Sequence, residues 1–160
     1  MEQVSDAQVM RLIERLGGHY RTNISNRFIR PALLQLSLDK IVWQNIESLT
    51  EKSDQFYYQG LHLDEMYRLV ASTAKFVAAT RREVLPGLRH RLEGGVSGPD
   101  KVLRDMVVST FPANLNIFAG LLCELYNRLK EIDVANAKGR KPLFQQTPEF
   151  FGIDDLIMHG

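Results

Sequence analysis

The chain has 160 residues, of which 44% are apolar and 24% are charged, as is ordinary for one soluble globular domain. The net charge of +1 excludes a strong overall attraction to nucleic acid or to an anionic membrane. The single cysteine, Cys123, excludes an internal disulfide and favours a reducing, cytoplasmic setting. The acidic N-terminus lacks the apolar region of a signal peptide.

The first predicted helix begins near Ser5 and ends at Gly17 and Gly18. Ser5 and Gln8 have the spacing of a capping box, in which side chains satisfy the first free N–H groups of a helix. Two glycines in succession are typical of a helix C-terminus. The apolar residues between these ends indicate one buried face: Val9, Leu12, Ile13 and Leu16.

A long second helix is predicted from Pro31 to about Lys52, after a polar and basic segment that starts at His19. Proline is favoured in a first turn because its missing N–H would have no helical partner there. The apolar stripe is wide, so we expect the helix to be covered on more than one side. Its members are Leu34, Leu38, Ile41, Val42, Trp43, Ile46 and Leu49.

The third predicted helix has the clearest stripe in the chain. We expect it to begin at Asp64, a good N-cap, after a connection interrupted by Gly60. Pro86 should kink or end it, because proline removes an intrahelical hydrogen bond. The glycines of residues 93–98 (EGGVSG) then predict a flexible loop. The stripe consists of Met66, Leu69, Val70, Thr73, Phe76, Val77 and Thr80.

The segment between Asp105 and Glu124 carries no charged residue and approaches the length of a membrane span. It has a proline and two asparagines near its middle, and polar groups at that depth of a bilayer are costly. We therefore expect no membrane span but two buried helices that meet at a corner, Phe111 and Pro112. The second continues through regularly spaced apolar residues: Leu115, Leu122, Leu125, Leu129 and Ile132.

No segment has the alternating pattern of a strand or the Asn-Gly or Asp-Gly pair of a hairpin. The sequence therefore predicts an all-α fold, a helical bundle of four to five main helices with a C-terminal tail that is extended or forms a short helix. We place the bundle domain at residues 1–135. Residues 136–160 form a basic linker followed by an apolar and acidic tail.

The tail is strongly apolar for a segment that follows a linker. Gly139 and Pro142 should stop the preceding helix, and three aliphatic residues then recur at the i, i+3, i+4 spacing of helices that bind in grooves. Soluble proteins rarely leave such a patch open, so the tail should dock on its own bundle, on a second copy or on another partner. The candidate contact residues are Phe150, Phe151, Ile153, Leu156 and Ile157.

The sequence contains no recognisable catalytic or metal-binding constellation. None of the four histidines has a second ligand at a spacing that suits a metal site, and no phosphate-binding loop or nucleophile motif occurs. Cys123 lies in an apolar run, without a basic neighbour that would lower its pKa. We therefore expect a protein that is not an enzyme and uses no cofactor and no metal.

Charge is arranged in blocks along the chain. Residues 11–30 carry five bases and one acid, residues 39–65 carry six acids and two lysines, and residues 66–104 carry eight bases and three acids. The last block could be a solvated face that pairs with the acidic block, a surface for an acidic protein segment, or a site for nucleic acid or anionic lipid. Its candidate contact residues are Arg81, Arg82, Arg89 and Arg91.

Three successive aromatic residues, 56–58, cannot all face one core. Tyr57 and Tyr58 are candidate interface residues because tyrosine combines an apolar body with a polar tip; alternatively, both lie along the end of the bundle. Together these features predict a module that binds another protein or a second copy of itself, as an adaptor, chaperone or assembly factor. The alternative is a nucleic-acid-binding regulator that uses residues 81–104.

Overall fold

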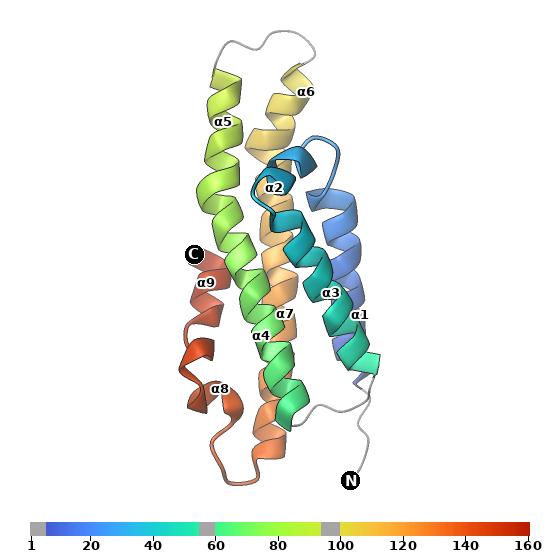
Figure 1. The fold of residues 1–160 in the computed structure, drawn as a ribbon, viewed down its shortest axis with the longest axis vertical. Helices are drawn as coiled ribbons and strands as arrows, with labels where there is room; N and C mark the ends of the chain where they lie inside the picture. The colour runs from blue at the N-terminus through green and yellow to red at the C-terminus, as the bar shows by residue number, and fades with distance from the viewer. Residues whose placement is uncertain (1–5, 55–59, 94–99) are drawn as a thin grey trace.

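The computed structural model describes residues 6–54, 60–93 and 100–160, and the regular elements in these ranges are all helical (Figure 1). The prediction of an all-α bundle is therefore confirmed. The α-helices are α1 (Ala7–His19), α2 (Arg30–Gln35), α3 (Leu38–Asp54), α4 (Gly60–Ala79), α5 (Leu85–Glu93), α6 (Asp100–Asp105), α7 (Phe111–Ala137), α8 (Leu143–Gln146) and α9 (Ile153–His159). The π-helical turns are η1 (Tyr20–Ile24), η2 (Thr80–Val84) and η3 (Met106–Thr110), and η4 (Pro148–Phe150) is a 3-10 turn.

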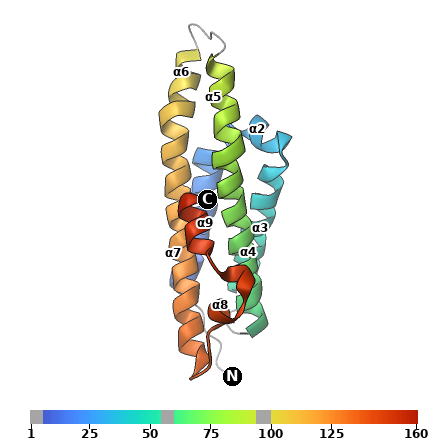
Figure 2. The same ribbon diagram turned by 90° about the vertical axis from the view of Figure 1, so that its left-hand side faces the viewer.

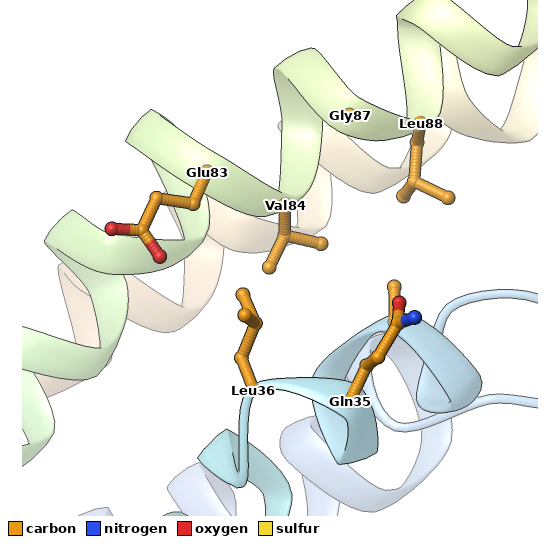
Figure 3. A pocket seen from close by; sticks show the side chains of 7 residues that line it. Gln35, Leu36, Glu83, Val84, Gly87 and Leu88 are labelled. Carbon is orange, nitrogen blue, oxygen red and sulfur yellow. The ribbon is translucent and has the colours of Figure 1, made fainter.

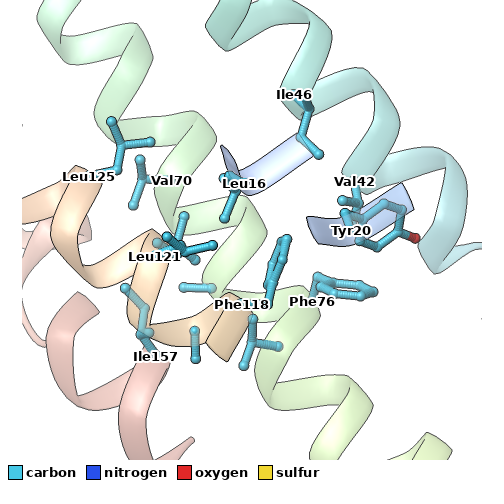
Figure 4. Packing of buried hydrophobic residues seen from close by; sticks show 14 of the residues in the cluster. Leu16, Tyr20, Val42, Ile46, Val70, Phe76, Phe118, Leu121, Leu125 and Ile157 are labelled. Atoms are coloured by element: carbon cyan, nitrogen blue, oxygen red, sulfur yellow. The ribbon is translucent and has the colours of Figure 1, made fainter. Parts of the chain in front are cut away.

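Helices α1, α3, α4 and α7 form the core of the bundle, and each packs against two of the others (Figure 1). Apolar side chains from all four meet around a group of aromatic rings (Figure 4). Tyr20 and Phe76 lie edge to face with ring centroids 5.7 Å apart, and Phe76 and Phe118 do so at 6.0 Å. Edge-to-face pairs of this kind add to the free energy gained from burial of the rings themselves.

Two long helical arms form an antiparallel hairpin that projects beyond α1 and α3 (Figures 1 and 2). Helix α4 continues through η2 into α5, and α6 continues through η3 into α7. Both η2 and η3 are π-helical turns. Along part of its length the bundle therefore has four packed helices, α1, α3, α4 and α7. Beyond this part, the hairpin formed by α5 and α6 continues, with α2 beside it (Figure 1).

The two π turns occur directly before Pro86 and Pro112. Proline has no N–H group, and its ring crowds the carbonyl four residues earlier. The N–H groups of Leu85 and Phe111 accordingly bond to carbonyls five residues back, which widens one turn and lets the helix continue. The predicted corner at Phe111 and Pro112 is therefore wrong, and the helix does not end at Pro86.

One helix in the described part of the chain, Met106–Ala137, is long and apolar enough to cross a membrane by length and composition. Of its most apolar window, 39% is buried inside the bundle, where α1 and α4 pack against α7. Core helices of soluble proteins meet the same criterion of length and composition, so the criterion is weak evidence for a span. That this helix does not cross a membrane stays a prediction.

The helix ends near the N-terminus differ from those predicted. Ser5 lies outside the described residues, and Asp6 is the N-cap of α1, where its Oδ1 accepts hydrogen bonds from the backbone N–H groups of Gln8 and Val9 at 2.9 and 3.2 Å. Helix α1 also continues through its glycines. A Cβ on Gly17 would lie 3.1 Å from Cγ2 of Ile46, so this glycine allows the close approach of α1 and α3.

The single helix predicted from Pro31 to Lys52 is two helices. Ser37 separates α2 from α3 and has a positive φ of 59°. Leu34, placed in the buried stripe, is consequently 53% exposed on α2. The third predicted helix also starts early, at Gly60, so Asp64 lies inside α4 and not at its N-cap. The loop at 94–98 lies outside the described residues.

A buried carboxylate holds the segment before α2 against α3. Asp39 is in the first turn of α3 and accepts hydrogen bonds of 2.7 Å from the hydroxyls of both Tyr20 and Ser25. The Nε of Arg30 lies 3.8 Å from the same carboxylate. Burial and the bond to Asp39 raise the pKa of Tyr20, so this tyrosine stays neutral. These contacts fix the position from which α2 leaves the bundle.

Candidate functional site

The C-terminal tail folds back along the hairpin, and α9 lies in the groove between α4 and α7 (Figure 2). Phe150 is 1% exposed, Ile153 and Ile157 are buried as well, and Leu156 packs partly buried against the same core. Phe151, by contrast, is 59% exposed. Of the three arrangements left open by the sequence, the structure has the tail docked on its own bundle.

Asp133 of α7 joins the tail to the bundle through a buried carboxylate. Its Oδ2 accepts a 2.8 Å hydrogen bond from the hydroxyl of Tyr67 and a 3.1 Å bond from the N–H of Phe144, and its Oδ1 accepts one of 3.0 Å from the N–H of Leu143. A buried carboxylate is stable only when such donors replace its water. Burial and the bond to Asp133 raise the pKa of Tyr67, which remains a donor.

Cationic side chains and a tyrosine hold the rest of the tail. The Nζ of Lys130 lies 3.0 Å from Oδ2 of Asp154, and the hydroxyl of Tyr126 donates to the carbonyl of Phe150 at 3.2 Å. Arg81 is half-buried and donates to the carbonyl of Ile157. Burial lowers its pKa. Arg81 therefore serves the tail, and its guanidinium is not open to a partner in this arrangement.

The remaining predicted contact residues fall in different places. Arg82 and Arg89 are exposed on η2 and α5, and neither forms an ion pair within the described residues. Tyr57 and Tyr58 lie outside the described residues, as does the side chain of Arg91. The structure thus separates the predicted site into a buried tail and an exposed basic segment.

A pocket of about 170 Å³ lies where α2 packs beside η2 and α5 (Figure 3). Leu36 and Val84 point toward each other across it, and the side chain of Glu83 lies at one end. Gly87 widens it, because a Cβ there would meet nothing within 4 Å. The lining residues are Ala32, Gln35, Leu36, Glu83, Val84, Gly87 and Leu88.

One exposed leucine lies in the lining of the pocket. Leu36, directly after α2, is 44% exposed and lines the pocket, whereas Leu34 is 53% exposed on the opposite side of α2. The sequence alone does not reveal this surface, because it predicts one long helix from Pro31 to Lys52. The signal that could have found it is the short, strongly apolar run LLQLSL after a proline, which is too apolar for the exposed end of a helix.

Groups with chemical reactivity are dispersed. Within residues 6–54, 60–93 and 100–160, no three His, Cys, Asp or Glu side chains are grouped so that they could hold a metal ion. Burial and the charge of Asp154 raise the pKa of the Cys123 thiol, which makes it a poorer nucleophile. His19 has its Nε2 2.8 Å from the carbonyl oxygen of Asn114, a structural bond between the end of α1 and α7.

Comparison with models of protein families, with curated proteins and with solved structures gives no match. The described chain has binding geometry at the face of α4 and α7 that holds the tail and at the pocket beside α2.

Proposed function

We propose that this protein is a non-enzymatic, protein-binding helical module, of the adaptor, chaperone or assembly-factor kind, and that its contact surface is formed by α2, η2 and α5. The observation that carries the proposal is the apolar pocket with the exposed Leu36 in its lining. An apolar centre inside a polar rim is the usual anatomy of a protein interface.

The lining of the pocket specifies the chemistry of the partner. Leu36, Val84 and Leu88 offer apolar surface to an aliphatic side chain. Arg82 and Arg89 are exposed on η2 and α5, but at about 100° per residue they lie on the face of the helix away from the pocket. Glu83 at one end of the pocket favours a hydrogen-bond donor at that end. We infer a ligand segment with an aliphatic anchor for the pocket and a hydrogen-bond donor for Glu83.

The direct test is selection of displayed peptides on the full chain. The proposal expects enrichment of peptides that combine an aliphatic anchor with a hydrogen-bond donor such as a lysine or arginine side chain. The variant Gly87→Leu fills the pocket from a helical position with open space around it, and it should abolish the enrichment. Gly18→Leu is the matched control, because this second open helical glycine lies on α1, away from the pocket.

The same protein distinguishes the alternative. A nucleic-acid regulator using residues 81–104 would bind labelled duplex or single strand at low salt, with an affinity that falls steeply as salt rises. Peptide enrichment that Gly87→Leu removes supports the protein-binding proposal. Peptides that bind the wild type and Gly87→Leu equally, or nucleic-acid binding without peptide binding, would overturn it.

A further inference from the structure

A polar pocket of about 190 Å³ lies where the chain turns back from α7 into α8, at the lower end of the bundle in Figure 1. Residues from α4, α7, α8 and the turn between the last two contribute to its lining. Leu63 and Leu143 give it apolar surface. The polar side chains of its lining include Asp133, Arg140, Lys141 and Gln146.

Two cationic side chains in this lining have no acidic partner in the part of the chain that the structure describes. Arg140 and Lys141 are exposed at the turn, and neither forms an ion pair there. Gln146 donates from its side-chain amide to the carbonyl of Lys141 and so closes the turn. Guanidinium and ammonium groups bind phosphate and carboxylate oxygens through charge-assisted hydrogen bonds. The lining therefore favours an anion that offers several acceptor oxygens.

The buried carboxylate of Asp133 in the same lining selects among anions. It already accepts hydrogen bonds from the hydroxyl of Tyr67 and from the N–H groups of Leu143 and Phe144. A carboxylate has about four acceptor positions, so about one stays open toward the pocket. A fully deprotonated anion such as sulfate is only repelled by this group. An anion that keeps an O–H group can donate to it, and inorganic phosphate stays protonated near neutral pH.

We propose that this pocket is a binding site for a phosphate ion that retains a proton. Arg140 and Lys141 bind its oxygens, and its O–H group donates to the open position of Asp133. Because the lining comes from three helices, the bound ion bridges α4, α7 and α8 and stabilises the reversal that leads into the tail. The site is separate from the α2–η2–α5 surface and does not depend on the protein binding proposed for that surface.

Calorimetric titration of the full chain with inorganic phosphate near neutral pH tests the site, with sulfate at the same ionic strength in parallel. We expect saturable binding of phosphate, and binding of sulfate that is weaker by at least about ten-fold. Arg140→Gln and Lys141→Gln should each weaken phosphate binding about five-fold, because each removes a charge-assisted hydrogen bond. Lys138→Gln is the matched control, since it removes the same charge from the same turn but lies outside the lining. It should change the affinity less than about two-fold.

Hydrogen exchange gives a second readout on the same protein. Saturating phosphate should slow exchange of the Leu143 and Phe144 amides, and sulfate at equal ionic strength should not. Absence of saturable phosphate binding to the wild type would overturn the proposal. Equal losses in Lys138→Gln and Arg140→Gln would also overturn it, because binding would then follow only the net charge of the turn. Sulfate that binds as tightly as phosphate would overturn the selection by Asp133 and with it the assignment of phosphate.

Discussion

The hydroxyl of Tyr67 in α4 donates a 2.8 Å hydrogen bond to the carboxylate of Asp133 in α7, at the point where the chain turns back into its tail. The same carboxylate accepts the first two N–H groups of α8. One buried anion therefore couples the two long helices of the hairpin to the C-terminal segment. Loss of that anion should loosen the tail before it affects the rest of the bundle.

Asp133→Ala should lower the free energy of unfolding by about 3 kcal/mol, because it leaves several buried donors without an acceptor. Tyr67→Phe, which removes one donor and keeps the bonds to α8, should cost only about 1 kcal/mol. Urea denaturation measures both. Equal costs for the two variants would contradict the role assigned to Asp133.

The reactivity of Cys123 should report the docking of the tail. The thiol is half-buried beside Asp154 of α9, so movement of α9 away from α7 should expose it further. We expect faster alkylation in Asp133→Ala than in wild type under native conditions. If the rate is unchanged while unfolding shows the expected loss of stability, Asp133 stabilises the bundle without holding the tail.

Phe150 and Phe151 are adjacent but should behave differently. Phe150→Ala should destabilise the fold by about 3 to 4 kcal/mol, because it opens a cavity beside Tyr67 and Tyr126. Phe151→Ala should change stability by less than about 0.5 kcal/mol, since the ring is exposed. Thermal or chemical unfolding of the two variants measures their stabilities. A larger loss of stability in Phe151→Ala than in Phe150→Ala would mean that Phe151, and not Phe150, is buried against the bundle.

Two adjacent glycines in α1 form a second matched pair. Gly18→Ala should stabilise the protein by about 1 kcal/mol, because alanine is the better helix former and the position has open space. Gly17→Ala should instead destabilise it by about 1 kcal/mol, since the new methyl would press on Ile46. If both variants were stabilising, α1 and α3 would be further apart than described.

Stability should fall in alkaline solution. Burial raises the pKa of Tyr126 to about 12, and it also raises the pKa values of Tyr20 and Tyr67. The unfolded chain releases these protons near pH 10.0, before the folded chain does. The stabilisation is thus complete below that pH and is lost as pH rises toward 12. Tyrosinate absorbance and circular dichroism should change together, whereas tyrosinate formation in a still folded protein would contradict the burial.

The helical pattern of the core could be predicted because the buried stripe of α4 recurs at helical spacing. Met66, Val70, Phe76 and Val77 are buried as the sequence indicates. Periodicity reports which side of a helix is apolar, and tertiary packing rarely reverses that. The all-α class follows from the same signal.

The predictions are wrong where a local rule for helix ends is overridden by tertiary packing or by a backbone adjustment. Proline predicts a helix end, but a single π turn before Pro86 and before Pro112 lets each helix continue. Gly17 is typical of a helix end but instead lets α1 and α3 approach each other. Leu34 fits the buried stripe of one continuous helix, but Ser37, between α2 and α3, adopts a positive φ that its residue type does not predict.

The functional surface was only partly visible in the sequence. The sequence indicates the basic block and the apolar tail as contact surfaces. It does not indicate that the tail is buried against the bundle while most of the basic block is exposed. Arg81 is used to hold the tail, and only the folded chain brings α2 beside α5 to form the pocket. Pockets between segments so distant in the chain depend on helix order in space, which periodicity does not encode. The cytoplasmic setting stays a prediction.

Native-state hydrogen exchange of residues 143–159 tests most directly the claim that the tail is part of the folded bundle. The amides of Leu143 and Phe144, which bond to Asp133, and those of the later turns of α9 should be protected in the wild type. Protection at 143 and 144 should be lost in Asp133→Ala. Exchange as fast as that of a free peptide throughout the wild-type tail would contradict the account.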